Sequence, residues 1–261
     1  MDIRSWQLFQ EQRERIVPRL ASNDTWEDVE AVIDWAMTYR PLDTPILSLA
    51  GRPHVIIWGE TDGFGGLPEV CKRMQEAPES TLIISGGVYG REETTGEIGA
   101  IDLYRRYHEE MEKLGWSNED IKRRVIIDSW SLHTGDQRIV LSAILSELGA
   151  PRVSIVLPLY HMPRFILTIN EGLKRLGVQL EIYPSPFGTR TTPHIAKRHI
   201  NKSETFTYEE LFALPPTRSR GADEVKSFDC GEIDKILEYQ QLRNKQCLTF
   251  REALDLFKIK N

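Results

Sequence analysis

Short runs of apolar, mostly β-branched residues alternate along the middle of the chain with longer stretches of helical periodicity. Nearly continuous apolar runs are typical of strands buried on both faces of a parallel sheet. Strands are predicted at 54–58, 81–85, 124–128, 152–157 and 179–183, with helices between them at 67–77, 93–114, 134–148 and 162–176. Because parallel strands need long crossover connections, this alternation predicts a doubly wound α/β sheet of about five strands.

Helical patterns without strands flank this region on both sides. Residues 2–21 and 25–40 are predicted as N-terminal helices, and further helices are predicted at 207–214, 231–244 and 249–257. No strand is predicted after Tyr183, because Pro184 and Pro186 are typical of a stiff loop. The chain is therefore divided into a helical segment (1–45), an α/β core (46–190) and a C-terminal helical extension (191–261).

Composition narrows the class of protein. The 261 residues are 40% hydrophobic and 28% charged, an ordinary globular balance, and three cysteines match no common zinc or disulfide spacing. A net charge of −6 argues against general binding to nucleic-acid backbones. No apolar run reaches the roughly 18 to 20 residues that span a bilayer, and the charged N-terminus lacks a signal-peptide core. We expect a cytoplasmic protein with no membrane partner.

Polar residues and glycines follow each predicted strand. In open α/β sheets the carboxyl ends of the strands share one edge, and ligands bind there. The sequence therefore predicts one small-molecule site at this edge. The candidate ligand-binding residues are Gly59, Glu60, Ser85, Gly86, Gly87, Ser131, His133, Thr134, Tyr160 and Arg164.

Arg164 and the nearby His161 are more informative than the other residues at this edge. They lie three positions apart around a helix start, so they can share a face. An arginine near a helix N-terminus opposes the helix dipole unless an anion lies between, which predicts a ligand with an anionic group. The alternative is a structural arginine paired with Asp128 or Glu97. His161 could exchange protons near neutral pH, with Glu97 or Asp136 as orienting group or second base, which makes these three the candidate catalytic residues.

Several plainer explanations stay open. Glycines after a strand are often turn residues, and Ser131 and Thr134 could cap the helix that begins there. The loop after Gly59 lacks the GxGxxG spacing, so no nicotinamide cofactor is predicted. Oxygen and nitrogen ligands for a metal could come from Glu60, Asp62, His133 and Asp136, but no fixed-spacing signature supports this and no metal is predicted.

Taken together, these motifs resemble one family. Ser85-Gly86-Gly87, Glu97, Ser131-x-x-Thr134 and the run from Tyr160 to Arg164 are similar to the DUF218 family, also called YdcF-like or ElyC/SanA-like proteins, over roughly residues 54–187. The resemblance implies a Rossmann-like fold and, from one branch of the family, S-adenosylmethionine as a candidate ligand or cofactor. His133, Asp136 and Gln137 stand where the family usually has Asn, Glu and Asn.

Three functions remain in competition. The first is an enzyme of hydrolase or transferase type that acts on a nucleotide-like or phosphorylated small molecule. The second is a non-catalytic module that binds or senses such a ligand. The third is a role in protein assembly through the terminal helices. The sequence predicts neither the substrate nor the oligomeric state.

Overall fold

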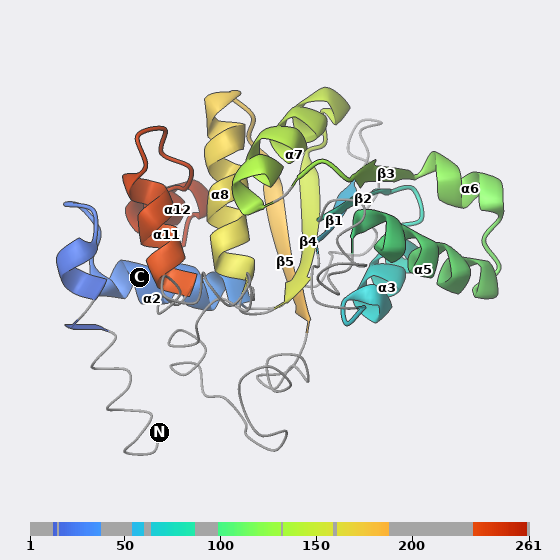
Figure 1. The fold of residues 1–261 in the computed structure, drawn as a ribbon, viewed down its shortest axis with the longest axis horizontal. Coiled ribbons are helices and arrows are strands. Elements are labelled where there is room, and N and C mark those ends of the chain that lie inside the picture. The colour runs from blue at the N-terminus through green and yellow to red at the C-terminus, as the bar shows by residue number, and fades with distance from the viewer. Residues whose placement is uncertain are drawn as a thin grey trace, which may run out of the picture. The chain divides into compact units, whose positions relative to one another are not determined.

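The apolar runs predicted as strands pair in one parallel sheet of order β3-β2-β1-β4-β5 (Figure 1). The computed structural model describes residues 13–14, 16–37, 54–59, 64–86, 99–131, 133–158, 161–187 and 232–259. The strands are β1 (Val55–Gly59), β2 (Thr81–Ser85), β3 (Val125–Asp128), β4 (Arg152–Pro158) and β5 (Glu181–Phe187). The predicted α/β class with a five-stranded, all-parallel sheet is confirmed.

Helices connect the strands much as predicted. They are α3 (Leu67–Glu76), α5 (Ala100–Lys113), α6 (Asn118–Arg123), α7 (Thr134–Leu148) and α8 (Met162–Arg175). Helix α5 begins at Ala100, and the earlier part of its predicted range, 93–98, lies outside the described residues. Helix α6 was not predicted, because six residues are too few for an apolar period to show.

The two faces of the sheet pack against different helices. Ile56, Trp58, Leu82, Ile84 and Val156 share one face and form a buried cluster with apolar side chains of α3, α5 and α6. Successive residues of a strand point to opposite faces, so Ser85 lies on the other face, where Gln137 of α7 contacts it. A parallel sheet with helices on both of its faces has the doubly wound arrangement.

The end predicted for the last strand was wrong. We expected a stiff loop from Pro184, whereas β5 continues to Phe187 in register with β4. Proline cannot donate a backbone hydrogen bond, but an edge strand has one side without a partner strand. Because β5 is last in the strand order, Pro184 and Pro186 are accommodated there.

The chain divides into two compact units. The first contains residues 1–36, 159–167 and 188–261, and the second contains residues 37–158 and 168–187 with the whole sheet. The described elements of the first unit are η1 (Val17–Arg19), α2 (Trp26–Met37), α11 (Glu232–Gln241), α12 (Phe250–Phe257) and the start of α8. The N- and C-terminal helical segments, predicted as separate parts, therefore belong to one unit.

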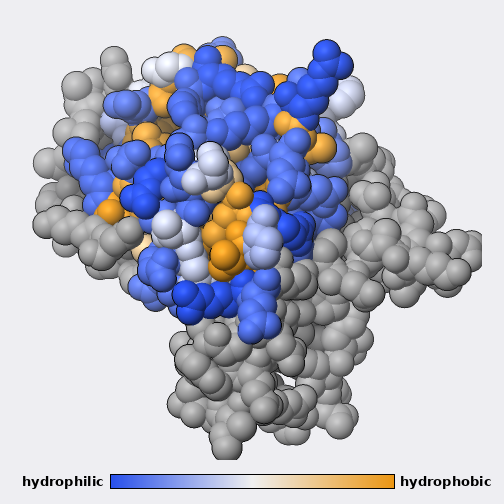
Figure 2. All heavy atoms as spheres, turned by 90° about the vertical axis from the view of Figure 1, so that its left-hand side faces the viewer, coloured by the Kyte–Doolittle hydropathy of each residue, from blue (hydrophilic) through white to orange (hydrophobic). Residues whose placement is uncertain are grey.

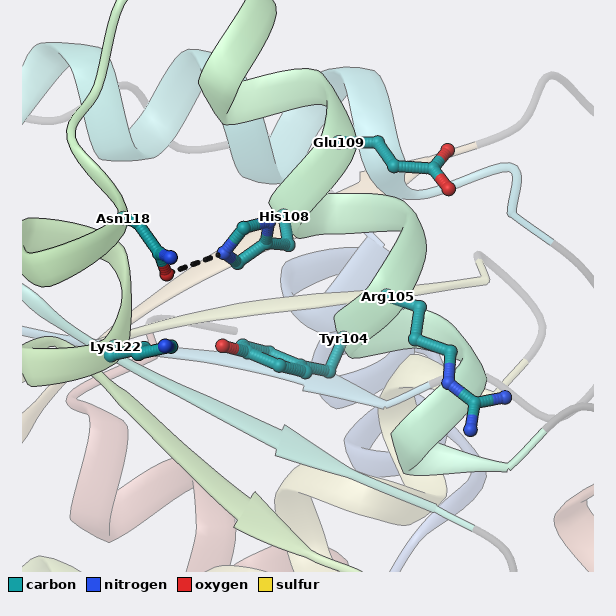
Figure 3. Close-up of a pocket in the computed structure, with 6 residues that line it drawn as sticks. All are labelled: Tyr104, Arg105, His108, Glu109, Asn118 and Lys122. Atoms are coloured by element: carbon teal, nitrogen blue, oxygen red, sulfur yellow. Dashed lines mark hydrogen bonds between the residues drawn. The ribbon is translucent and has the colours of Figure 1, made fainter.

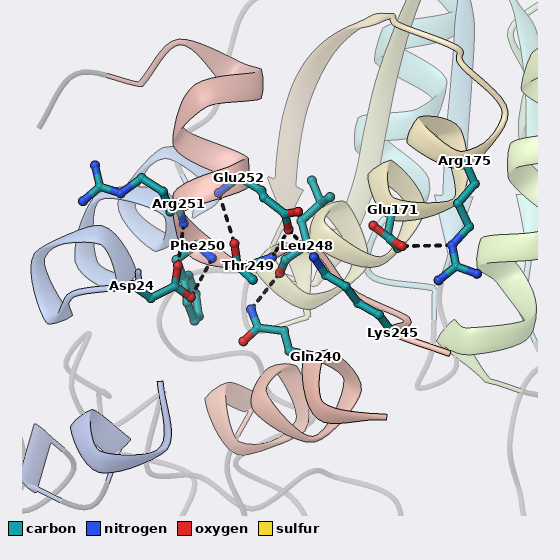
Figure 4. A network of polar contacts seen from close by, with 10 residues as sticks. All are labelled: Asp24, Glu171, Arg175, Gln240, Lys245, Leu248, Thr249, Phe250, Arg251 and Glu252. Carbon is teal, nitrogen blue, oxygen red and sulfur yellow. Dashed lines mark hydrogen bonds and ion pairs between the residues drawn. The ribbon is translucent and has the colours of Figure 1, made fainter. Parts of the chain in front are cut away.

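Polar contacts join the segment before α2 to the start of α12 in the first unit (Figure 4). Asp24 accepts hydrogen bonds from the backbone N–H groups of Phe250 and Arg251, at 3.1 and 2.9 Å. Thr249 and Glu252 cap the same helix end locally in a reciprocal capping box. Burial raises the pKa of Asp24, although these two backbone hydrogen bonds lower it.

The surface seen in Figure 2 is mostly hydrophilic, with a few small apolar groups separated by polar side chains. Large apolar side chains of the first unit, such as Trp26, Phe250 and Ile236, are at most 6% exposed. Among the described residues, no helix combines the length and the apolar character needed to span a bilayer.

Asp24→Ala should destabilise the protein by about 1 to 2 kcal/mol, because two N–H groups at the start of α12 would lose their acceptor. Urea denaturation followed by circular dichroism would measure the change. Asp255→Ala, which removes an exposed carboxylate from the same helix, is the control and should change stability little. Equal effects of the two substitutions would contradict the capping role.

His54 provides a buried titratable group at the amino-terminal end of β1. Its Nε2 lies 3.0 Å from Ser154 Oγ, and its ring meets Tyr183 edge-on. The side chain is only 5% exposed. Burial lowers the pKa of His54 to about 4, with further repulsion from Arg73 and Arg152. The histidine is therefore neutral in the folded protein at pH 7.

The protein should lose stability as the pH falls from about 6.5 towards 4. In this window the unfolded chain, with a histidine pKa of about 6.5, binds a proton that the folded chain does not. The contribution of His54 is about 2 kcal/mol between pH 7.5 and pH 5. Denaturation curves of the wild type and His54→Gln at both pH values would test this. A pH dependence that is the same in both proteins would contradict the assignment.

Candidate functional site

A buried carboxylate joins the carboxyl ends of β2 and β3. Asp128 is the last residue of β3 and lies in register with Ser85, the last residue of β2. The hydroxyls of Ser85 and Ser131 donate to Oδ2 of Asp128, at 2.6 and 2.5 Å. The backbone N–H groups of Trp130 and Ser131 donate to Oδ1, at 3.1 and 3.2 Å. Each carboxylate oxygen thus accepts two hydrogen bonds.

Helix α7 completes this Asp128 network. Gln137 Nε2 donates to Ser85 Oγ at 3.0 Å. The exposed fractions of Ser85, Asp128, Ser131 and Gln137 are 0, 2, 1 and 6%. A buried polar group is stabilising only when its hydrogen bonds are made, and the polar groups here satisfy one another. The network therefore fixes the end of β2 and the segment from Ser129 to Ser131 after β3, at the edge where the site was predicted.

The glycines of the predicted site have two different structural roles. Gly86 has φ of +143°, a conformation that side chains rarely adopt, and its N–H points to the carbonyl of Asp128 at 3.5 Å. A Cβ on Gly59 would lie 2.9 Å from Leu157 Cδ2 and 3.3 Å from the carbonyl oxygen of Ser85. Gly86 therefore makes the turn after β2, and Gly59 permits close packing at the end of β1.

His133 forms the N-cap of α7. Its Nδ1 accepts a hydrogen bond from the backbone N–H of Asp136 at 3.2 Å, and its Nε2 lies 3.6 Å from the Asp136 carboxylate. Capping by Ser131 or Thr134 was the alternative considered from the sequence. Ser131 instead belongs to the Asp128 network, and Thr134 is the first, buried residue of the helix. His133 and Asp136 form a half-exposed pair at this helix end.

The spacing of His161 and Arg164 allows them to share a face, and at the start of α8 they also contact each other. Arg164 Nη2 lies 2.9 Å from His161 Nδ1. A guanidinium group can only donate, so Nδ1 must accept, and the ring is neutral with its proton on Nε2. Nε2 of His161 therefore carries the hydrogen and can only donate. This pair belongs to the first unit, whereas the Asp128 network belongs to the second.

Part of the predicted site lies outside the described residues. These positions are Glu60, Gly87, Glu97 and Tyr160, together with Asp62 of the metal alternative. Within the portion of the chain that is described, no three His, Cys, Asp or Glu side chains converge in a way that could hold a metal ion.

A separate pocket of about 450 Å³ lies on the outer surface of α5 and α6 (Figure 3). It is lined by Tyr104, Arg105, His108, Glu109, Asn118 and Lys122. The side chains carry both signs of charge, and His108 Nε2 lies 3.0 Å from Asn118 Oδ1. None of the residues singled out in the sequence lines this pocket.

A comparison with models of known protein families and a search of curated proteins both gave no match. The resemblance to the DUF218 family therefore stays a prediction, carried by the motifs themselves.

Sequence reasoning missed the central residue of the network. Asp128 entered only as an alternative partner for Arg164, yet its two oxygens already accept four hydrogen bonds from neighbouring residues. A local signal was present. Aspartate followed by Ser129, Trp130 and Ser131 is typical of an Asx-turn, in which the side chain accepts from the backbone two and three positions ahead. Strand position and turn chemistry together would have identified it.

Asp128→Asn should destabilise the protein by about 1.5 to 3 kcal/mol. The amide NH₂ would replace an oxygen that accepts from Ser85 and Ser131, so hydrogen bonds to a buried charged group would be lost. Thermal and urea denaturation would measure the loss.

Asp120→Asn is the matched control. Asp120 accepts from the hydroxyl of Ser117 at 2.7 Å, the same kind of hydrogen bond, but in an exposed position. We expect Asp120→Asn to change the free energy of unfolding of the protein little. If Asp128→Asn and Asp120→Asn lowered the free energy of unfolding equally, burial of the Asp128 network would not contribute to stability.

Proposed function

We propose that this chain binds a nucleotide-like or phosphorylated small molecule at the carboxyl edge of its sheet, as a DUF218-like protein. S-adenosylmethionine is one candidate. The observation that carries the proposal is the strand order. The chain runs from β1 to β2 and β3 on one side and continues with β4 and β5 on the other, which creates a switch point beside β1. Ligands of open α/β sheets bind at such points.

The Asp128 network supports this location. It anchors the end of β2 and the segment that follows β3 without using solvent-facing groups, because its side chains are at most 6% exposed. A rigid edge lets backbone groups hold a ligand at a low entropic cost. Gly59, Ser85, Gly86 and Ser131 then act as the frame of the site, while Glu60 and Gly87 stay candidates for direct contact.

The His161–Arg164 pair supports recognition of an anionic group. Guanidinium suits phosphate and carboxylate, because its planar fork can donate two hydrogen bonds at once. The neutral ring of His161 can donate a hydrogen bond from Nε2 to an oxygen of the ligand, but a neutral imidazole N–H is too weak an acid to protonate a leaving group. We favour a hydrolase or transferase in which Asp136 and Glu97 are the candidates for proton transfer and His161 is a hydrogen-bond donor to the reacting group.

A non-catalytic binding module is the second candidate, and one observation favours it. Both serine hydroxyls of the network donate to Asp128, and no described serine of the predicted site contacts a histidine base. An enzyme of this form would need water or a ligand group as its nucleophile. A cytoplasmic location is part of the same proposal in either case.

Native mass spectrometry of gently purified protein tests for a retained ligand. Calorimetric titration with ATP, S-adenosylmethionine and inorganic phosphate tests binding directly, and chromatography of the incubated mixtures tests turnover. Binding with turnover supports an enzyme, whereas binding without turnover supports the second candidate. If none of the probes binds and no small molecule co-purifies, the proposal is wrong.

Arg164→Lys should weaken binding of the tightest of these probes roughly ten- to a hundredfold, because an ammonium group cannot reproduce the planar fork. Arg175→Lys is the matched control on the same helix, since Arg175 pairs with Glu171 at 2.9 Å as an ordinary ion pair. Titration calorimetry and thermal melting should be done on each preparation. A lower melting temperature with unchanged affinity would mean that Arg164 only braces the fold.

A further inference from the structure

Trp130 is the most exposed large hydrophobic side chain among the described residues, at 85%. Trp26, Trp35 and Trp58 are 6, 8 and 0% exposed. An indole ring normally buries a large apolar area, and its enrichment at binding surfaces reflects this. An almost fully exposed tryptophan therefore needs an explanation.

The backbone that carries this ring is anchored. The N–H of Trp130 donates to Asp128 Oδ1 at 3.1 Å. The next residue, Ser131, is 1% exposed and donates to Asp128 from both its backbone and its hydroxyl. The indole thus extends into solvent from a chain segment held by a buried network, and not from a loose loop.

The position of Trp130 matches the proposed ligand site. It follows β3 by two residues, at the carboxyl edge of the sheet. Strand β3 is separated from β1 by β2 alone. Neighbouring strands lie about 4.8 Å apart, so the ends of β1 and β3 are about 10 Å apart. A nucleoside can bridge this distance from the switch point beside β1.

We propose that Trp130 is the stacking platform for the heterocyclic ring of the ligand. This inference rests on the proposed function and narrows the ligand to compounds with a planar base, such as an adenine nucleotide or S-adenosylmethionine. Stacking on an aromatic side chain needs no hydrogen-bond partners, because the base offers its π-face. The ring is available before binding and is positioned by the Asp128 network.

The surroundings of Trp130 in the chain favour this occupant over a protein partner. Energetically important tryptophans in protein interfaces are ringed by other contact residues that exclude water. Trp130 lies between Ser129 and Ser131, and the Ser131 side chain is turned inwards to Asp128. The two immediate chain neighbours of the ring are serines, which suits a flat ligand better than a ring of apolar contact residues.

Titration calorimetry with three probes tests the platform. ATP and S-adenosylmethionine carry the base, whereas inorganic tripolyphosphate carries charge alone. Trp130→Ala should weaken binding of the two adenine probes about tenfold, and Trp130→Phe should weaken it less, because a ring is kept. Affinity for tripolyphosphate should not change. The adenine probes should also quench a part of the tryptophan fluorescence that is absent from Trp130→Phe.

Ile139→Ala is the control, since Ile139 on α7 is also apolar and exposed, at 63%. It should leave all affinities unchanged. If wild type and Trp130→Ala bind the adenine probes equally, the platform is wrong while the proposed function stands. If none of the three probes binds the wild-type protein, the stacking role of Trp130 and the proposed function are both wrong. If Trp130→Ala changes self-association in gel filtration but no affinity, the ring belongs to a protein interface and the proposal is overturned.

Discussion

The carboxylate of Asp128 lies at the end of a parallel sheet where water does not reach, with an exposed fraction of 2%. Removing a charged group from water is costly, and the cost is offset only when hydrogen bonds satisfy the group fully. Ser85, Ser131 and the backbone of Trp130 supply those bonds. This requirement determines the path of the chain after β3. The segment must turn back so that two N–H groups and a hydroxyl reach the carboxylate.

The same requirement joins elements that are far apart in the sequence. Ser85 and Asp128 are 43 positions apart, and Ser85 and Gln137 are 52 apart. Parallel pairing of β2 with β3 brings the first pair together in register. Because α7 covers the face on which Ser85 lies, Gln137 reaches the same hydroxyl. The carboxyl edge is thus connected across β2, β3 and α7.

Local patterns of the sequence were sufficient for most of the fold, and long-range pairing was not predictable. The limits of β2 and α7 were predicted to the residue, since Gly86 and the polar run before Thr134 mark them clearly. Helical spacing indicated that His161 and Arg164 can share a face, and they lie close enough there to contact each other. The extension of β5 through Pro184 did not, because it depends on β5 being an edge strand. Asp128 has a local Asx-turn signal that was overlooked, and only its long-range partner, Ser85 on β2, depends on strand order.

The hydrogen-bond donors and acceptors of the Asp128 network and of the His161–Arg164 pair restrict the reactions that the proposed site could catalyse. An acceptor-only carboxylate forces the hydroxyls of Ser85 and Ser131 to donate, and Gln137 donates to the oxygen of Ser85. That oxygen is therefore a poor nucleophile. Conversely, the donor-only guanidinium of Arg164 forces Nδ1 of His161 to accept, which leaves an N–H on Nε2. Within the proposed function, the nucleophile is therefore water or a ligand group rather than Ser85, and Arg164 and His161 act as hydrogen-bond donors to an anionic group.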